Sequence, residues 1–173
     1  MLELKKLPTA AIPAALAKAE RYRLLNEPFE AESICLDILE ADPQNAGAMV
    51  TLILALSDEF SRTGAQGVQD AQALVPRLPH EYERAYYAGI ICERWVKSQL
   101  GLKPAHTLYH WLREALEHFE RAAELAPADN ADAVLRWNSA ARLLNAHPEM
   151  APKSSDDPGG EGYGWDEPPG GGA

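Results

Sequence analysis

The sequence predicts an all-α protein, and three observations support this prediction. Apolar residues recur at the three- and four-residue spacing of a helix face as far as about residue 147. No segment shows the alternation of apolar and polar residues that marks a strand flanked by hairpin turns. Proline, glycine and asparagine interrupt the periodic stretches at short intervals, so we expect successive helices to be antiparallel neighbours.

The first two helices are bounded by turn residues. Asn26, Glu27 and Pro28 separate them, because proline costs least in the first turn of a helix. Asp42 and Pro43 end the second helix, since a residue before proline is disfavoured in the helical conformation. With the five helices that follow, the expected set spans residues 12–25, 28–41, 45–62, 68–78, 80–100, 105–126 and 130–145.

The later boundaries follow from the same punctuation. Asn45 can cap the third helix, and residues 64–67 with two glycines break the chain after it. Pro76 kinks or ends the fourth helix. Residues 101–104 separate the fifth helix from the sixth, and residues 127–130 stop the sixth and cap the seventh.

Composition changes near residue 147, which divides the chain into two parts. Residues 148–173 are rich in glycine, proline and acidic residues, and they cannot bury enough apolar area to offset their ordering entropy. We therefore expect a helical domain over residues 1–147 and a disordered acidic tail over residues 148–173. Tyr163 and Trp165 are the large apolar groups of the tail. They could form a docking sequence or occupy the protein's own groove, but a tail that only aids solubility is favoured.

Charge and apolar content exclude several classes of protein. The chain has 16 Lys+Arg against 26 Asp+Glu, a formal net charge of −10, which argues against nonspecific binding to nucleic acid or anionic lipid. No apolar run approaches the roughly 20 residues of a membrane span, and the N-terminus lacks an apolar signal core. We expect a cytoplasmic protein without a nucleic-acid or membrane partner. Cys35 and Cys92 are too few for a disulfide framework.

The second and sixth helices share one pattern, in which a small residue is followed by two core positions and a closing proline. It falls on Ala31, Cys35, Ile38 and Pro43 in one helix and on Ala115, Phe119, Ala122 and Pro127 in the other.

This pattern resembles the second helix of a tetratricopeptide repeat, whose period is 34 residues. Tyr22 matches the tyrosine of the family's first helix, Gly89 takes the family's glycine position, and Pro79 closes a middle repeat. The resemblance covers residues 12–127. It implies a right-handed α-solenoid of about three helical hairpins, with residues 130–145 as a capping helix. A generic array of helical hairpins is the alternative.

The capping helix of such a solenoid needs a polar outer face, because no further repeat covers it. Asp132, Arg136 and Arg142 are expected to supply part of this face.

In the resembled family, the first helices of successive repeats line a concave groove that receives a peptide or a helix of a partner. The family's carboxylate-binding Lys and Asn are not matched, since Leu16 and Glu20 stand at those positions. The groove is expected to be apolar with acidic edges, which suits a partner with apolar anchors and basic flanks. The positions carried over are Leu16, Glu20, Arg23, Met49, Leu52, Leu56, Glu59, Glu83, Tyr86, Ile90 and Glu93.

The resemblance thus predicts a non-enzymatic adaptor or scaffold that needs no cofactor. A small acidic chaperone, like the tetratricopeptide chaperones of bacterial secretion systems, is a second interpretation. Cys35 and Cys92 are interpreted as small buried apolar residues, because neither lies in a glycine-rich turn that would activate a thiolate. No serine lies in a glycine elbow.

A stripe of histidines offers a rival of another class, a helical metal-binding protein. His106, His110, Glu114 and His118 follow at four-residue intervals, and residues four apart lie on one helix face. Such a face could bind a metal ion through His106, His110 and His118. The plainer interpretation is a solvated polar face on which Glu114 and His118 form a pair.

Overall fold

The computed structural model describes residues 2–152 and confirms the all-α prediction for them. In this part of the chain there is no β-strand, and Leu100 and Lys103 form one isolated β-bridge. Residues 153–173, with Tyr163 and Trp165, lie outside the described residues. The helices are α1 (Ile12–Leu24), α2 (Pro28–Ala41), α3 (Ala46–Asp58), α4 (Phe60–Leu74), α5 (Glu81–Gln99), α6 (Tyr109–Leu125) and α7 (Asp132–Ala146). Short 3-10 turns are η1 (Thr9–Ala11), η2 (Val75–Arg77), η3 (Ala105–Leu108) and η4 (Pro148–Met150).

The turn residues act as the sequence predicts at the first helix boundaries. Pro28 lies in the first turn of α2. Asn26 adopts a positive φ of 62°, a conformation that asparagine tolerates better than most residues. Asn45 caps α3, because its side-chain oxygen accepts a hydrogen bond of 3.0 Å from the backbone N–H of Ala48.

The boundary between α3 and α4 differs from the prediction of one helix over residues 45–62. Helical geometry is interrupted at Glu59, so α3 ends at Asp58. The helical stretch that follows contains a kink at Gly64, whose φ of 63° and ψ of −144° are not helical. A glycine is needed there for its backbone freedom, since a Cβ would meet nothing within 4 Å. The break expected over residues 64–67 is therefore confined to a kink at Gly64, and the fourth helix begins at Phe60 rather than at residue 68. It ends at Leu74, and Pro76 follows in η2, in agreement with its predicted role as a helix breaker.

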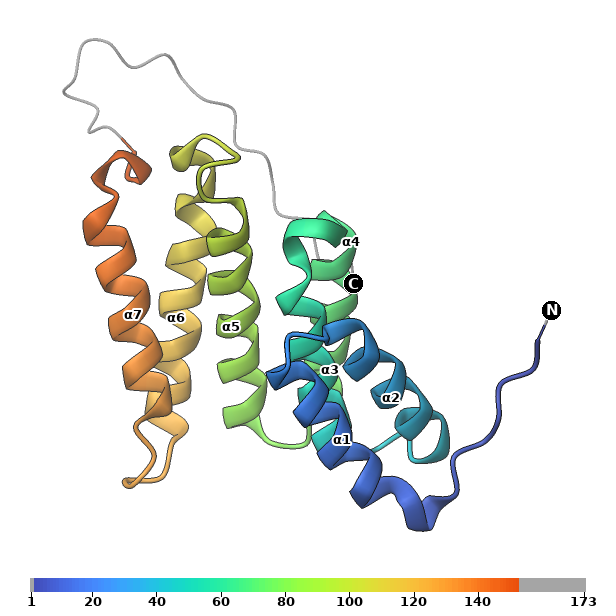
Figure 1. The fold of residues 1–173 in the computed structure, drawn as a ribbon. Coiled ribbons are helices and arrows are strands. Elements are labelled where there is room, and N and C mark those ends of the chain that lie inside the picture. Colours follow the sequence, from blue (N-terminus) through green and yellow to red (C-terminus); the bar gives the residue numbers. More distant parts are fainter. Residues whose placement is uncertain (1, 153–173) are drawn as a thin grey trace.

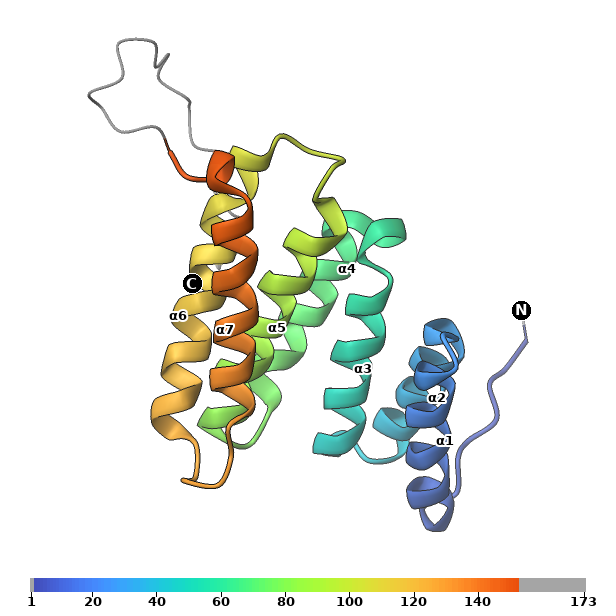
Figure 2. The same cartoon turned by 60° about the vertical axis from the view of Figure 1, so that its left-hand side comes forward.

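The helices follow one another across the molecule in chain order. Figures 1 and 2 agree that α1 and α2 lie at one end and that α6 and α7 lie at the other. Each helix packs on the next one, and α3 also packs on α1 and α5. This open array of hairpins is compatible with an α-solenoid.

Contacts between alternate helices show that these helices run parallel. Leu16 lies against Gly47 near the start of α1 and α3, and Arg23 pairs with Asp58 near their ends. Just before α5, Arg77 donates a hydrogen bond of 2.9 Å to the carbonyl of Pro43, which precedes α3. Alternate helices therefore share one direction, and the helices between them run back.

Alanines and one glycine allow the helices to approach closely. Ala31, Ala115 and Ala122 are fully buried, in agreement with their small-residue positions in the predicted repeat. Gly89 of α5 faces the ring of Phe119 on α6, and a Cβ at Gly89 would lie 2.7 Å from that ring. The contact between α5 and α6 at this point therefore depends on glycine.

The packed part of the chain extends beyond residue 147, where the domain was expected to end. Pro148–Met150 forms the turn η4, which contacts η3, and the Met150 side chain is fully buried. Composition alone placed Met150 in the tail, because a single apolar residue is a weak signal among prolines and acidic residues.

The outer face of α7 agrees only in part with the expected polar surface: Asp132 and Arg142 are exposed, but Arg136 is not. Arg136 is half-buried and turned toward α5, where it pairs with Glu93. Val134, Leu135 and Trp137 are exposed instead. Polar contact with the buried Glu93 carboxylate accounts for the position of Arg136.

We predict that Gly89→Ala lowers the free energy of unfolding by about 1 kcal/mol. The new methyl group overpacks against Phe119, at a cost of about 1–3 kcal/mol, which exceeds the gain of roughly 1 kcal/mol in helix propensity. Urea unfolding followed by circular dichroism measures the change. In a Phe119→Leu background the same substitution should be neutral or stabilising. A stabilising effect in the unmodified chain would contradict this packing.

Candidate functional site

A charged cluster joins the first three alternate helices. The carboxylate of Asp58, in the last turn of α3, pairs with Arg94 of α5 and with Arg23 of α1, whose Nε lies 2.7 Å from Asp58 Oδ2. Arg94 also donates hydrogen bonds to Ser57 Oγ at 2.9 Å and to the Leu54 carbonyl at 3.3 Å. A cation at the C-terminal end of a helix is favourable, since that end carries partial negative charge.

Burial has the largest effect on the protonation equilibrium of Arg94. It lowers the pKa of the guanidinium, and the Asp58 carboxylate beside it acts in the opposite direction. The pairing with Asp58 therefore compensates for the water that Arg94 loses when α5 packs against α3.

A second cluster joins α5 to α7 around a fully buried carboxylate, that of Glu93. It accepts hydrogen bonds from Lys97 Nζ at 2.5 Å, from Arg136 Nη1 at 3.3 Å and from Ser139 Oγ at 3.3 Å. A buried charge is costly unless it is paired and hydrogen-bonded. These three donors explain how a charged residue can lie inside the helical array.

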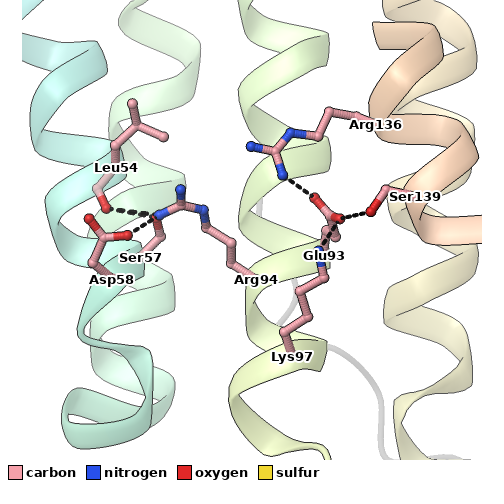
Figure 3. A network of polar contacts seen from close by, with 8 residues as sticks. All are labelled: Leu54, Ser57, Asp58, Glu93, Arg94, Lys97, Arg136 and Ser139. Carbon is pink, nitrogen blue, oxygen red and sulfur yellow. Dashed lines mark hydrogen bonds and ion pairs between the residues drawn. The ribbon is translucent and has the colours of Figure 1, made fainter. Parts of the chain in front are cut away.

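The two clusters meet on adjacent residues of α5. Figure 3 shows that Arg94 reaches toward α3 and that Glu93 reaches toward α7. Successive residues of a helix point about 100° apart, so one turn of α5 makes polar contacts with helices on both of its sides. The helices α1, α3, α5 and α7 are thereby linked into one face of the array, called here the odd-helix face.

The structure places five of the predicted groove residues in the core, so the prediction that they line an open groove is wrong. Four of them are apolar residues of α3 and α5 that pack against neighbouring helices, and the fifth is the buried Glu93 carboxylate. Partner residues cannot reach them in this arrangement. The five are Met49, Leu52, Leu56, Ile90 and Glu93, each less than 8% exposed.

Glu59 lies between α3 and α4 and faces away from the odd-helix face. It pairs with Arg62. Burial raises the pKa of Glu32 on α2; Asp70 of α4 and Glu59 add to this rise, whereas Arg62 opposes it. Glu59 therefore lies among charges of α2 and α4 rather than on the odd-helix face.

The other predicted groove residues remain near the surface. Glu20 is exposed, and Leu16 and Arg23 are half-buried against α3. Glu83 and Tyr86 are half-buried on the first turns of α5. Val50 and Leu54 of α3, which the sequence reasoning missed, are half-buried as well. The sequence does contain a signal for them. Val50, Leu54 and Asp58 are four residues apart and therefore lie on one face of α3, and the exposed Asp58 marks this face as the one near solvent.

Tyr86 belongs to an aromatic cluster. Its ring stacks on Tyr82 at 5.7 Å and contacts Tyr87 edge-on at 5.2 Å, and it lies 6.0 Å from the Phe119 ring. Burial raises the pKa of Tyr87 to about 12. Tyr86 is thus held by neighbouring rings and presents part of its surface to solvent.

The histidine stripe is divided by the fold. His106 lies in η3, ahead of α6, and the His110 ring lies 5.5 Å from the Trp111 ring. Burial lowers the pKa of His110, whereas Glu114 acts to raise it. His118 Nε2 lies 3.6 Å from Glu114 Oε1, which agrees with the predicted pair. The His118 imidazole beside it holds the pKa of Glu114 below its usual value.

A residue of α5 completes a different group of metal-type donors. The Cys92 thiol lies beside Glu114 and His118, and one ligand atom of each lies within 4.8 Å of the others. Among residues 2–152, these are the three metal-type donors whose ligand atoms lie close enough together to share an ion. The group includes neither His106 nor His110. The sequence reasoning missed Cys92 because it belongs to another helix.

Cys35 and Cys92 are both buried, which confirms their interpretation from the sequence as buried residues. Burial raises the pKa of the Cys35 thiol to about 12, and Glu20 and Glu32 add to the rise. Burial also raises the pKa of Cys92, with a further contribution from Glu114. At neutral pH both side chains are therefore thiols rather than nucleophilic thiolates.

No protein-family model matches the chain, and neither the curated proteins nor the solved structures contain a match to it. The tetratricopeptide resemblance therefore rests on the sequence pattern. Among residues 2–152, no helix has the length and apolar character required to cross a membrane.

We predict that Glu93→Gln lowers the free energy of unfolding by about 1–2 kcal/mol, because it weakens the charge-assisted hydrogen bonds to Arg136 and Lys97. Both partners are partly exposed, so water compensates for some of the loss. Glu117→Gln is the matched control, since Glu117 is exposed on α6 and should change stability by less than about 0.5 kcal/mol. Equal effects of the two substitutions in urea unfolding would contradict the role of Glu93.

Proposed function

We propose that this protein is a non-enzymatic interaction module that receives a peptide or helix of a partner protein on the odd-helix face. The observation that supports this proposal best is the open array itself. Parallel helices α1, α3 and α5 lie next to one another, α7 is linked to α5 through Glu93, and the array is not closed into a bundle (Figures 1 and 2).

Ion pairs connect the helices of the odd-helix face to one another. Arg23, Asp58 and Arg94 tie three of its helices together. Glu93 and Arg136 add the fourth. A surface that is already ordered loses little conformational entropy on binding, so more of the contact energy contributes to affinity.

The side chains left on this face define the chemistry of the partner. Leu16, Val50 and Leu54 are half-buried apolar groups that a partner could cover further. Glu20 is exposed one helical turn after Leu16 on α1, and the chain carries a net charge of −10. A segment with apolar anchors and basic flanks would complement such a surface. These residues replace the buried members of the predicted groove.

Site-specific photocrosslinking tests the proposal. A photoreactive amino acid at position 20, on α1, should crosslink one partner protein in an extract of the source cells. The same group at position 120, exposed on α6, should not crosslink that partner. Equal crosslinking from both positions, or none from position 20, would overturn the proposal.

We predict that Glu20→Lys weakens binding of the crosslinked partner by about three- to tenfold, because the reversed charge repels its basic flank. Glu120→Lys makes the same change in net charge and should leave the affinity unchanged. Affinities measured by calorimetry at two salt concentrations separate the local effect from the overall charge, since screening reduces the effect of Glu20→Lys. Equal loss in both variants would reject a site on the odd-helix face.

A further inference from the structure

We propose that Cys92, Glu114 and His118 bind a divalent transition-metal ion of the zinc type at the junction of α5 and α6. The proposal is independent of partner binding on the odd-helix face. It differs from the metal site expected from sequence, because two of the three histidines of that site are not part of it.

The spacing of the donors fits a single ion. The ligand atoms of the three residues lie within 4.8 Å of one another. A tetrahedral zinc ion, with ligand distances of about 2.0–2.3 Å, holds its donors about 3.3–3.6 Å apart. Movements of about an ångström would close the site, and rotation of the half-exposed Glu114 and His118 side chains can supply them.

The backbone places these donors with little freedom. Glu114 and His118 are one helical turn apart on α6, the spacing at which two side chains on one face can share a ligand. Cys92 reaches them from α5, three residues after Gly89, and Phe119 follows His118 in sequence. The close contact between Gly89 and Phe119 therefore brings the thiol of one helix to the histidine of the other.

The chemistry of the donors selects the type of ion. Thiolate, imidazole and carboxylate are the three ligand types that zinc takes from proteins. Magnesium and calcium prefer oxygen ligands alone. When the ion binds, the Cys92 thiol releases its proton to solvent and forms a metal–sulfur bond. The thiolate and the carboxylate then balance the charge of a divalent ion, and His118 binds as a neutral group.

The exposure of the group leaves one coordination position open to solvent. Cys92 is buried, whereas the side chains of Glu114 and His118 are 43% and 35% exposed. An ion can thus enter from the solvent side and keep a water molecule as its fourth ligand. Three protein ligands with an open fourth position differ from a closed structural site, which uses four.

Cobalt titration of the full chain, purified without a histidine tag and treated with a chelator, tests the proposal. We expect one cobalt ion per chain, a thiolate-to-cobalt charge-transfer band in the near ultraviolet and the intense visible bands of four-coordinate cobalt. One equivalent of zinc should remove both signals. Absence of the charge-transfer band, or binding of less than one ion per chain at saturation, would overturn the proposal.

Variants identify the ligands. Cys92→Ala should abolish the charge-transfer band, and His118→Gln and Glu114→Gln should each abolish stoichiometric binding. His110→Gln is the matched control, one turn before Glu114 on the same helix, and should bind as the unmodified chain does. His118 is half-exposed, so its variant should fold even if Cys92→Ala does not. Unchanged binding in His118→Gln, or loss in folded His110→Gln, would reject this ligand set.

Discussion

The pairing of Glu93 and Arg94 with opposite neighbours is the interaction on which the arrangement of the helices depends. Glu93 is fully buried and needs the donors of α5 and α7 around it. Arg94 is half-buried and needs Asp58 of α3. Because charges removed from water are costly when unpaired, α3 and α7 must lie on the two sides of α5. The places of α3 and α7 on either side of α5 are consistent with that requirement.

Close packing provides the second constraint. Gly89 lets the Phe119 ring approach α5, and the fully buried Ala115 and Ala122 continue the small surface along α6. The same approach brings Cys92 beside Glu114 and His118. One glycine thus supports both the stacking of the third hairpin and the donor cluster that we assign to a metal ion. A change at this position would therefore disturb two features at once.

The predicted binding residues differ most from the structure on α3. Sequence reasoning assigned the groove to Met49, Leu52 and Leu56, the most apolar stripe of the helix, but this stripe packs in the core. The side that remains near solvent carries Val50, Leu54 and Asp58. Apolar residues in a binding face and apolar residues in a core have the same periodicity, so the pattern alone cannot tell them apart.

The sequence by itself determined the class of fold, the burial of Cys35 and most helix boundaries to within a few residues, the boundary between α3 and α4 excepted, because proline, glycine and helical periodicity act locally. Only the tertiary structure decided that Arg136 turns inward to Glu93, that Met150 is packed, and that Cys92 rather than His110 joins His118. These features involve residues on different helices. Their contacts depend on how the helices are rotated and spaced, which local sequence patterns do not specify.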